Sequence, residues 1–170
     1  LPSGGYKLSA NYDFAGNFVG GDFNFSKAVL RGDFYKTIYS TATDGKHILA
    51  LNGLFGWAEP NSPSDELPIF ERFYAGGINT VRGFEFRTIS PKENDISIGG
   101  NAIVTANLEY TFPILRTESF DNYTDWLRFL VFYDWGTVSE NVSTLSDYRR
   151  SVGFGFKFVM PYMGPMPFLS

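Results

Sequence analysis

Residues 101–114, NAIVTANLEYTFPI, alternate between two kinds of side chain. The even-numbered positions from 102 to 112 are apolar or aromatic, whereas Thr105, Asn107, Glu109 and Thr111 occupy odd-numbered positions. Successive side chains of a β-strand point to opposite faces of the sheet, so a period of two predicts a strand with one apolar face and one polar face.

The same period recurs along the chain, between clusters of Gly, Asn, Asp, Ser and Pro. The further strands that it predicts lie at 6–14, 47–57, 126–138 and 148–160, with a truncated one near Met166. Segment 22–39 is also rich in strand-forming residues, but its phase is mixed. Lys27, Arg31 and Asp33 share a side there with Phe23, Phe25 and Val29, and we expect a β-bulge or phase slip in this segment.

Two all-β architectures bury one face of such strands. A soluble sandwich or jelly roll hides the apolar face inside, whereas a membrane barrel turns it outward to lipid. The polar faces here carry Asn, Thr, Ser and Gly with isolated charges, and aromatic residues gather at strand ends, as in the girdles of a barrel. Aromatic residues reach 18% of the chain and charged residues only 19%. These features favour a transmembrane antiparallel β-barrel.

Composition also argues against several kinds of site. The formal net charge is −4 and no basic stripe is present, which argues against a nucleic-acid partner. There is no Cys and His47 is the single histidine, so we expect no thiolate nucleophile, no metal site and no cofactor. No apolar run approaches the length of a transmembrane helix.

The segment 59–100 interrupts the regular strands for roughly forty residues, and connections of that length in compact folds are usually functional or disordered. Its aromatic residues and paired glycines, within 70–84, suit a loop that folds back on an apolar surface. We therefore expect an ordered, functional loop.

Several short motifs carry a resemblance to a known family. They are Tyr74-Ala75-Gly76-Gly77, Thr80-Val81-Arg82-Gly83-Phe84, Thr88-Ile89-Ser90-Pro91, Gly99-Gly100-Asn101-Ala102, Leu108-Glu109-Tyr110, Phe132 to Val138, and Gly164-Pro165. In this order the series resembles the BamA-like family of outer-membrane barrel insertases, with its related two-partner secretion pores. The resemblance is strong over about the last hundred residues and rests on strand pattern alone over the first sixty.

The resemblance implies a sixteen-stranded barrel of which residues 1–170 form the C-terminal part, with about seven strands. The periplasmic repeat domains and the first strand of the barrel seam would be absent from this segment. The loop at about 59–100 would be extracellular and would fold into the lumen.

The family places its motif arginine against inward residues of neighbouring strands, a role that falls here to Arg82. The predicted loop motif is Gly76, Gly77, Val81, Arg82, Gly83 and Phe84, and its predicted lumen partners are Glu109, Phe132 and Asp134. The residues themselves agree with this, since a buried guanidinium needs carboxylates and stacks well on an aromatic ring. A solvated Arg82, or a carbonyl or water partner for it, is the alternative. Glu109 and Asp134 would also suit a catalytic carboxylate pair, but no His or activated Ser accompanies them, and we expect no catalytic residue.

The function implied by the resemblance is non-enzymatic: the protein would fold and insert other β-barrel proteins through a lateral seam of the bacterial outer membrane. Its partners would be unfolded outer-membrane β-barrel clients, accessory assembly lipoproteins and outer-membrane lipids. The rival interpretations are a two-partner secretion transporter of the same superfamily and a passive porin.

Overall fold

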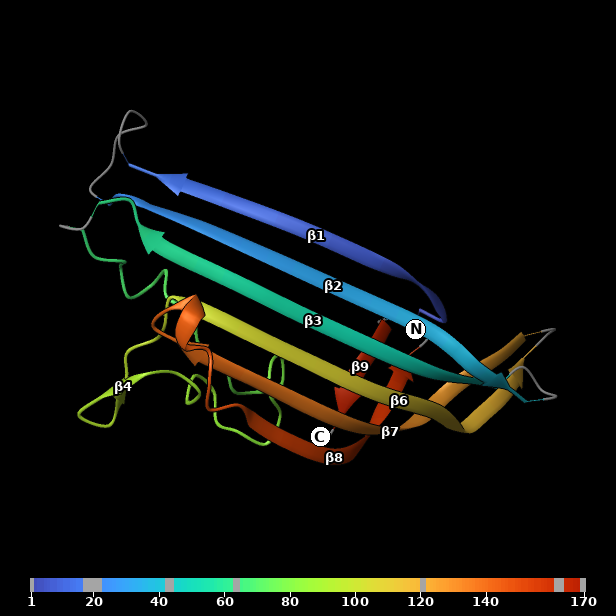
Figure 1. Cartoon of the computed structure of the whole chain (residues 1–170). Helices are drawn as coiled ribbons and strands as arrows, with labels where there is room; N and C mark the ends of the chain where they lie inside the picture. Colours follow the sequence, from blue (N-terminus) through green and yellow to red (C-terminus); the bar gives the residue numbers. More distant parts are fainter. Residues whose placement is uncertain are drawn as a thin grey trace.

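The computed structural model describes residues 2–16, 23–41, 45–62, 65–119, 122–160 and 164–168. Seven strands form one antiparallel sheet, in the order β1 (Gly4–Ala15), β2 (Phe25–Ser40), β3 (Lys46–Pro60), β6 (Ala102–Ser119), β7 (Asn122–Ser139), β8 (Arg149–Met160) and β9 (Gly164–Phe168). Each strand pairs with its neighbour in the chain, apart from the insertion between β3 and β6 (Figure 1). The predicted all-β meander and the six strands with a short seventh are confirmed.

The two ends of the sheet differ in their connections. At one end, called the loop end, segments 16–24, 61–101 and 140–148 join the strands, whereas short segments join them at the other end. The longest segment contains the small ribbon of β4 (Lys92–Glu93) and β5 (Ile96–Ser97), and the 3-10 turn η2 (Val142–Thr144) lies between β7 and β8. Figure 1 shows the long segment gathered at the loop end. Long loops at one end and short turns at the other are typical of outer-membrane barrels.

The β-bulge or phase slip expected in segment 22–39 is present near the end of the segment, but it does not cause the mixed phase at its start. Asp22 lies outside the described residues, and β2 pairs with β1 without interruption from Phe25 to Lys36. A register shift does occur against β3, between Thr37 and Tyr39, but it lies beyond the mixed stretch. The charged residues of β2 therefore belong to a regular strand face, and Lys27 finds its partner in the long loop.

Burial on the sheet is inverted relative to a soluble protein. Leu108, Val131 and Tyr133 of the apolar face are about 40% exposed, whereas Glu109 is 8% exposed and Asp134 is fully buried. A soluble sandwich would bury the first set and expose the second. The apolar face is therefore the outer face of a barrel wall, and the polar face is the inner face, against which the long loop packs.

The long loop is ordered by its own backbone and by two apolar clusters. Paired backbone hydrogen bonds join Phe73 to Gly100 and Ala75 to Ile89. One cluster joins loop and wall through Ala75, Val81, Ile89, Ile103 and Val138, and the other through Phe25, Ala58 and Leu67, with Phe73 packed against both. No helix in the described ranges is long and apolar enough to cross a membrane.

Candidate functional site

The turn that presents Arg82 depends on glycines with a left-handed backbone. Gly76, Gly77 and Gly83 have φ values of +104°, +94° and +82°, a region that residues with a side chain rarely adopt. A Cβ on Gly76 would also stand 2.3 Å from the carbonyl oxygen of Glu85. The sequence prediction that these glycines permit tight turns agrees with this geometry.

Hydrogen bonds within the turn then close it. The Thr80 hydroxyl donates to the carbonyl oxygen of Gly76 and accepts from the Gly76 N–H, while the Gly77 N–H donates to the Phe84 carbonyl at 2.9 Å. The Asn107 side chain on β6 donates to the carbonyl of Thr80. The turn is thus fixed to the barrel wall one residue before the buried Val81-Arg82 pair.

Arg82 binds two carboxylates of the inner face. Its Nε and Nη2 donate to Oδ2 and Oδ1 of Asp134 at 2.7 and 2.8 Å, its backbone N–H donates to Oδ2 at 3.0 Å, and its Nη1 donates to Oε2 of Glu109 at 2.8 Å. The planar guanidinium matches the fork of a carboxylate in this bidentate way, which an ammonium cannot do. The structure therefore brings Arg82 together with both carboxylates that the sequence had singled out.

An aromatic ring supports the guanidinium. The Cζ atom of Arg82 lies 3.7 Å from the centre of the Phe132 ring, within the range of a cation–π contact. Phe132 is the cross-strand partner of both Glu109 on β6 and Gly153 on β8. A Cβ on Gly153 would stand 2.6 Å from Cζ of Phe132, so the absence of a side chain on β8 leaves room for the ring.

Lys157 on β8 is a second cation of the site. Its ammonium contacts Oε1 of Glu109, whose other oxygen accepts from Arg82. Two cations and two carboxylates therefore form a four-charge cluster of Arg82, Glu109, Asp134 and Lys157 with no formal net charge. Their side chains are 12%, 10%, 0% and 20% exposed. A buried charge is tolerated only when it is paired and hydrogen-bonded, and all four carboxylate oxygens of this cluster have a cationic partner.

The ionisation of Arg82 reflects two opposing effects. Burial lowers the pKa of Arg82, but hydrogen bonds and charge attraction from Asp134 and Glu109 raise it by more, so the net shift is upward. The guanidinium is therefore held in its charged form. The solvated Arg82 considered from the sequence is not what the structure shows.

The neighbours of Arg82 in the motif pack on the wall. Val81 is fully buried in the first apolar cluster, and its Cγ2 would stand 2.9 Å from a Cβ on Gly136 of β7. Phe84 is half-buried against the same cluster. Val81 and Phe84 thus anchor the turn by apolar contact on either side of the ionic contact.

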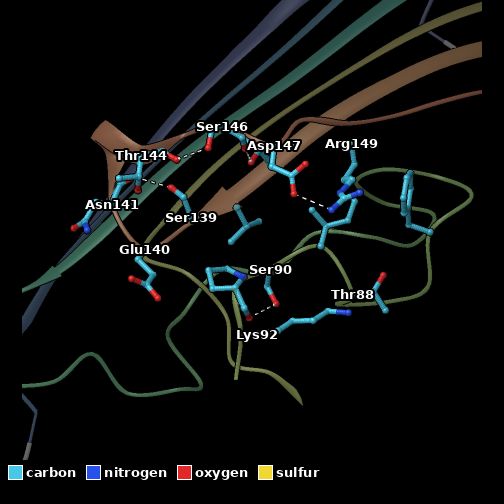
Figure 2. A pocket seen from close by; sticks show the side chains of 15 residues that line it. Thr88, Ser90, Lys92, Ser139, Glu140, Asn141, Thr144, Ser146, Asp147 and Arg149 are labelled. Atoms are coloured by element: carbon cyan, nitrogen blue, oxygen red, sulfur yellow. Dashed lines mark hydrogen bonds and ion pairs between the residues drawn. The ribbon is translucent and has the colours of Figure 1, made fainter. Parts of the chain in front are cut away.

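A pocket of about 720 Å³ lies beside the motif, at the loop end. Figure 2 shows Thr88, Ser90 and Lys92 of the long loop on one side of it, and residues of the β7–β8 connection on the other, including Asp147, which pairs with Arg149 at the start of β8. Phe84 also lines it. The pocket is therefore lined by both the long loop and the β7–β8 connection.

A second ionic contact holds the loop on β2. The Lys27 ammonium donates to Oε2 and to the carbonyl oxygen of Glu71, both at 3.0 Å, and lies 5.0 Å from the centre of the Phe73 ring. The side chains of Lys27 and Glu71 are 18% and 31% exposed. The loop therefore has two ionic anchors, on β2 and on β6 to β8.

The most buried arginine of the described wall is Arg128 on β7, at 2% exposure. It pairs with Asp125 and donates to the backbone carbonyl oxygen of Lys46 at 2.6 Å, and its Nη2 also lies 3.2 Å from Oγ1 of Thr111. Arg128 thus links β7, β6 and β3 on the inner face. Lys157, Lys27, Glu71 and Arg128 were not among the predicted site residues. The sequence shows Lys157 and Arg128 as charges on the polar face of a strand, Lys27 as a charge in a segment of mixed phase, and Glu71 as a charge in the loop, and solvent is the ordinary partner of such charges.

Together, the outward apolar face, the polar inner face and the loop bound within it define part of the wall of an outer-membrane β-barrel. Comparison with known proteins agrees: the Omp85 superfamily domain model matches residues 1–169. The chain belongs to the Omp85 superfamily. The sequence predictions of a BamA-like barrel and of a location in the bacterial outer membrane are confirmed.

Three relatives illustrate the extent of the match. Outer membrane protein assembly factor BamA of Nitratidesulfovibrio vulgaris is 29% identical over 172 residues, covering 98% of this chain and 20% of the relative. The BamA of Neisseria meningitidis serogroup B is 32% identical, covering 81% of this chain and 16% of the relative. The sorting and assembly machinery component 50 homolog of Mus musculus is 31% identical, covering 67% of this chain and 23% of the relative. The chain thus spans about a fifth of the length of these relatives.

A solved structure shares the fold. The crystal structure of BamA from Haemophilus ducreyi lacking POTRA domains 1-3 superposes with a TM-score of 0.75 at 23% identity, covering all of this chain and 36% of that one.

Proposed function

We propose that this chain is the C-terminal part of the barrel of an outer-membrane β-barrel assembly factor. The whole protein folds and inserts other β-barrel proteins through a lateral seam, without covalent chemistry. The names of the relatives support assembly over polypeptide secretion, because BamA and the sorting and assembly component are both named as assembly proteins.

The observation that carries the proposal is the way the long loop is bound. Arg82 is paired with two buried carboxylates on β6 and β7, and Lys157 on β8 completes the neutral cluster. Such a contact resists separation, because removing one partner leaves a buried charge uncompensated. The loop in our proposal braces strands β6 to β8, so that the wall stays rigid while the seam elsewhere in the barrel opens.

The same geometry supports a non-enzymatic mechanism. All four oxygens of Glu109 and Asp134 accept hydrogen bonds from Arg82 or Lys157. A general acid or base needs a carboxylate oxygen within reach of a substrate proton. Client strands would instead pair with an exposed strand edge, which is β-augmentation.

The remaining parts of the proposal concern the whole protein. The barrel has sixteen strands, the long loop is extracellular, and periplasmic repeat domains outside this segment receive clients. Its partners are unfolded β-barrel clients, accessory assembly lipoproteins and outer-membrane lipids.

The test is replacement of Arg82 by Ala in the full-length protein that contains this chain. We expect less folded porin in cells, measured by the heat-dependent mobility of porins on gels, at an unchanged level of the variant protein. Arg87→Ala is the matched control, because Arg87 is an arginine of the same loop whose side chain lies near the rings of Tyr74 and Phe86 instead of the carboxylates. Normal porin assembly in the Arg82 variant would overturn the bracing role.

A further inference from the structure

The outer face of β8 carries one cation at the loop end. The outward positions of the strand run Arg150, Val152, Phe154 and Phe156, and Val152 and Phe154 are 75% and 67% exposed. Arg150 pairs across the ladder with Trp135 of β7, and side chains directly opposite each other lie on the same face of a sheet. A guanidinium thus stands at the end of a row of lipid-facing side chains.

Aromatic residues surround this guanidinium. Tyr133, Trp135, Tyr148 and Arg150 line a surface cavity of about 400 Å³. The rings of Trp135 and Tyr148 meet edge to face with their centres 5.2 Å apart. Tyr and Trp favour the boundary between hydrocarbon and headgroups, where one end of the ring is wet and the other apolar. The cavity therefore lies at the depth of lipid headgroups.

Arg150 has no hydrogen bond, ion pair or ring contact with the described part of the chain, whereas its neighbour Arg149 pairs with Asp147 at 2.8 Å. Arg149 lies opposite Gly136 and lines the pocket next to the long loop. The two arginines are adjacent in sequence and point to opposite faces of the wall. Only the outward one lacks an anion.

We propose that Arg150, Trp135, Tyr148 and Tyr133 bind the phosphate-bearing headgroup of an anionic lipid in the leaflet at the loop end. The guanidinium can donate to two phosphate oxygens at once. A phosphate would therefore supply the anionic partner that Arg150 lacks in the described part of the chain. The acyl chains lie along Val152 and Phe154. One lipid thus contacts the aromatic residues with its headgroup and the apolar face of β8 with its acyl chains. The site holds a lipid against β7 and β8 and is independent of the assembly function proposed above.

The experiment uses the full-length protein in nanodiscs of phosphatidylcholine with a minor fraction of phosphatidylglycerol, and native mass spectrometry of the lipids that remain bound after release. We expect Arg150→Gln to lower the retained phosphatidylglycerol about fivefold, the effect of one basic residue near an anionic surface. Arg149→Gln is the matched control and should retain the wild-type amount. Trp135→Leu should also lower retention, because it removes one wall of the cavity.

Several outcomes would overturn the site. They are equal retention by the Arg150 variant and the wild type, an equal loss in the Arg149 variant, which would indicate a general charge effect, and displacement of the lipid by millimolar inorganic phosphate, which would indicate a free-anion site. Arg150→Lys is the control for a folding defect, because it changes the same position but keeps the positive charge. It lacks the planar guanidinium, and it should retain more phosphatidylglycerol than Arg150→Gln. Retention by the Lys variant as low as that of the Gln variant would contradict the proposal.

Discussion

Gly153 of β8 lies directly opposite Phe132 of β7, and the Phe132 ring fills the space that a side chain at position 153 would need. The same ring lies 3.7 Å from the guanidinium carbon of Arg82. A glycine on one strand therefore sets the position of an aromatic ring on the next strand, and that ring supports the arginine of a loop. Strand propensity does not explain the glycine at position 153, since glycine weakens a strand.

Replacement of Gly153 by Ala should loosen the long loop. Its Cβ would stand 2.6 Å from the Phe132 ring, so the ring must move and the stack on Arg82 is weakened. We expect faster cleavage of the loop by added protease in the folded full-length protein. Gly32→Ala is the control, because its Cβ would meet Leu8 at an ordinary 3.7 Å. Equal cleavage of the two variants would show that Gly153 does not control the loop.

Arg82→Lys tests the planar fork separately from the charge. The ammonium cannot hold both oxygens of Asp134 and one of Glu109 at once, so a buried carboxylate oxygen loses its partner. We expect the free energy of unfolding of the barrel, from urea titration in micelles, to fall by about 2 kcal/mol, the usual cost of an unpaired buried polar group. Arg87→Lys in the same loop should change it little. A fully stable Arg82→Lys variant would mean that charge alone suffices.

Strand alternation was the part of the fold that the sequence could predict well. On the outer face a run such as Val152, Phe154 and Phe156 is exposed and has only apolar or aromatic neighbours of its own kind, such as Phe129 beside Phe154 and Phe156, so its period of two is clear in the sequence. The phase of β2 was harder to interpret. Lys27 on the same side as Phe25 looked like a slip, whereas both residues contact the long loop.

The residues of the site could be predicted only where they belong to the sequence motifs that carry the family resemblance. Arg82, Glu109, Phe132 and Asp134 were expected together, and the structure places them in contact. Lys157 was missed because a lysine on a polar face is ordinarily solvated. In the register of the sheet Gly153 lies in line with Glu109 and Phe132, whereas Lys157 lies opposite Arg128, so its contact with Glu109 cannot be read from residue spacing.

Lys157 should be coupled energetically to Glu109. We would measure the free energy of unfolding in a double-mutant cycle with Lys157→Gln and Glu109→Gln. The sum of the losses in the two single variants should exceed the loss in the double variant by about 1 kcal/mol or more. The Glu109 variant should be the more harmful single change, because it also removes one partner of Arg82. Additive losses would indicate that the Lys157 contact contributes nothing measurable to the cluster.

Val81 should contribute to the free energy of unfolding through packing alone. It is fully buried between the loop and β7, so Val81→Ala leaves a cavity that the wall cannot readily close. We expect a loss of about 1–2 kcal/mol in unfolding free energy, at the lower end for removal of buried carbon atoms, with the charge contacts of Arg82 intact. Ile78→Ala is the control, because Ile78 in the same turn is 56% exposed. A loss in the control as large as that for Val81 would argue against the buried contact.

The Lys27–Glu71 pair should act as a second, weaker anchor of the loop. Its side chains are partly exposed, and such pairs contribute about 1 kcal/mol or less, so each single reversal, Lys27→Glu or Glu71→Lys, should speed protease cleavage of the loop modestly. The double reversal should restore protection, because the attraction is regained with the charges exchanged. The effect should shrink in high salt, which screens exposed charges more than buried ones. If the double reversal cleaves as fast as the worse single variant, the contact of Lys27 with the Phe73 ring and the Glu71 backbone carbonyl outweighs the ion pair.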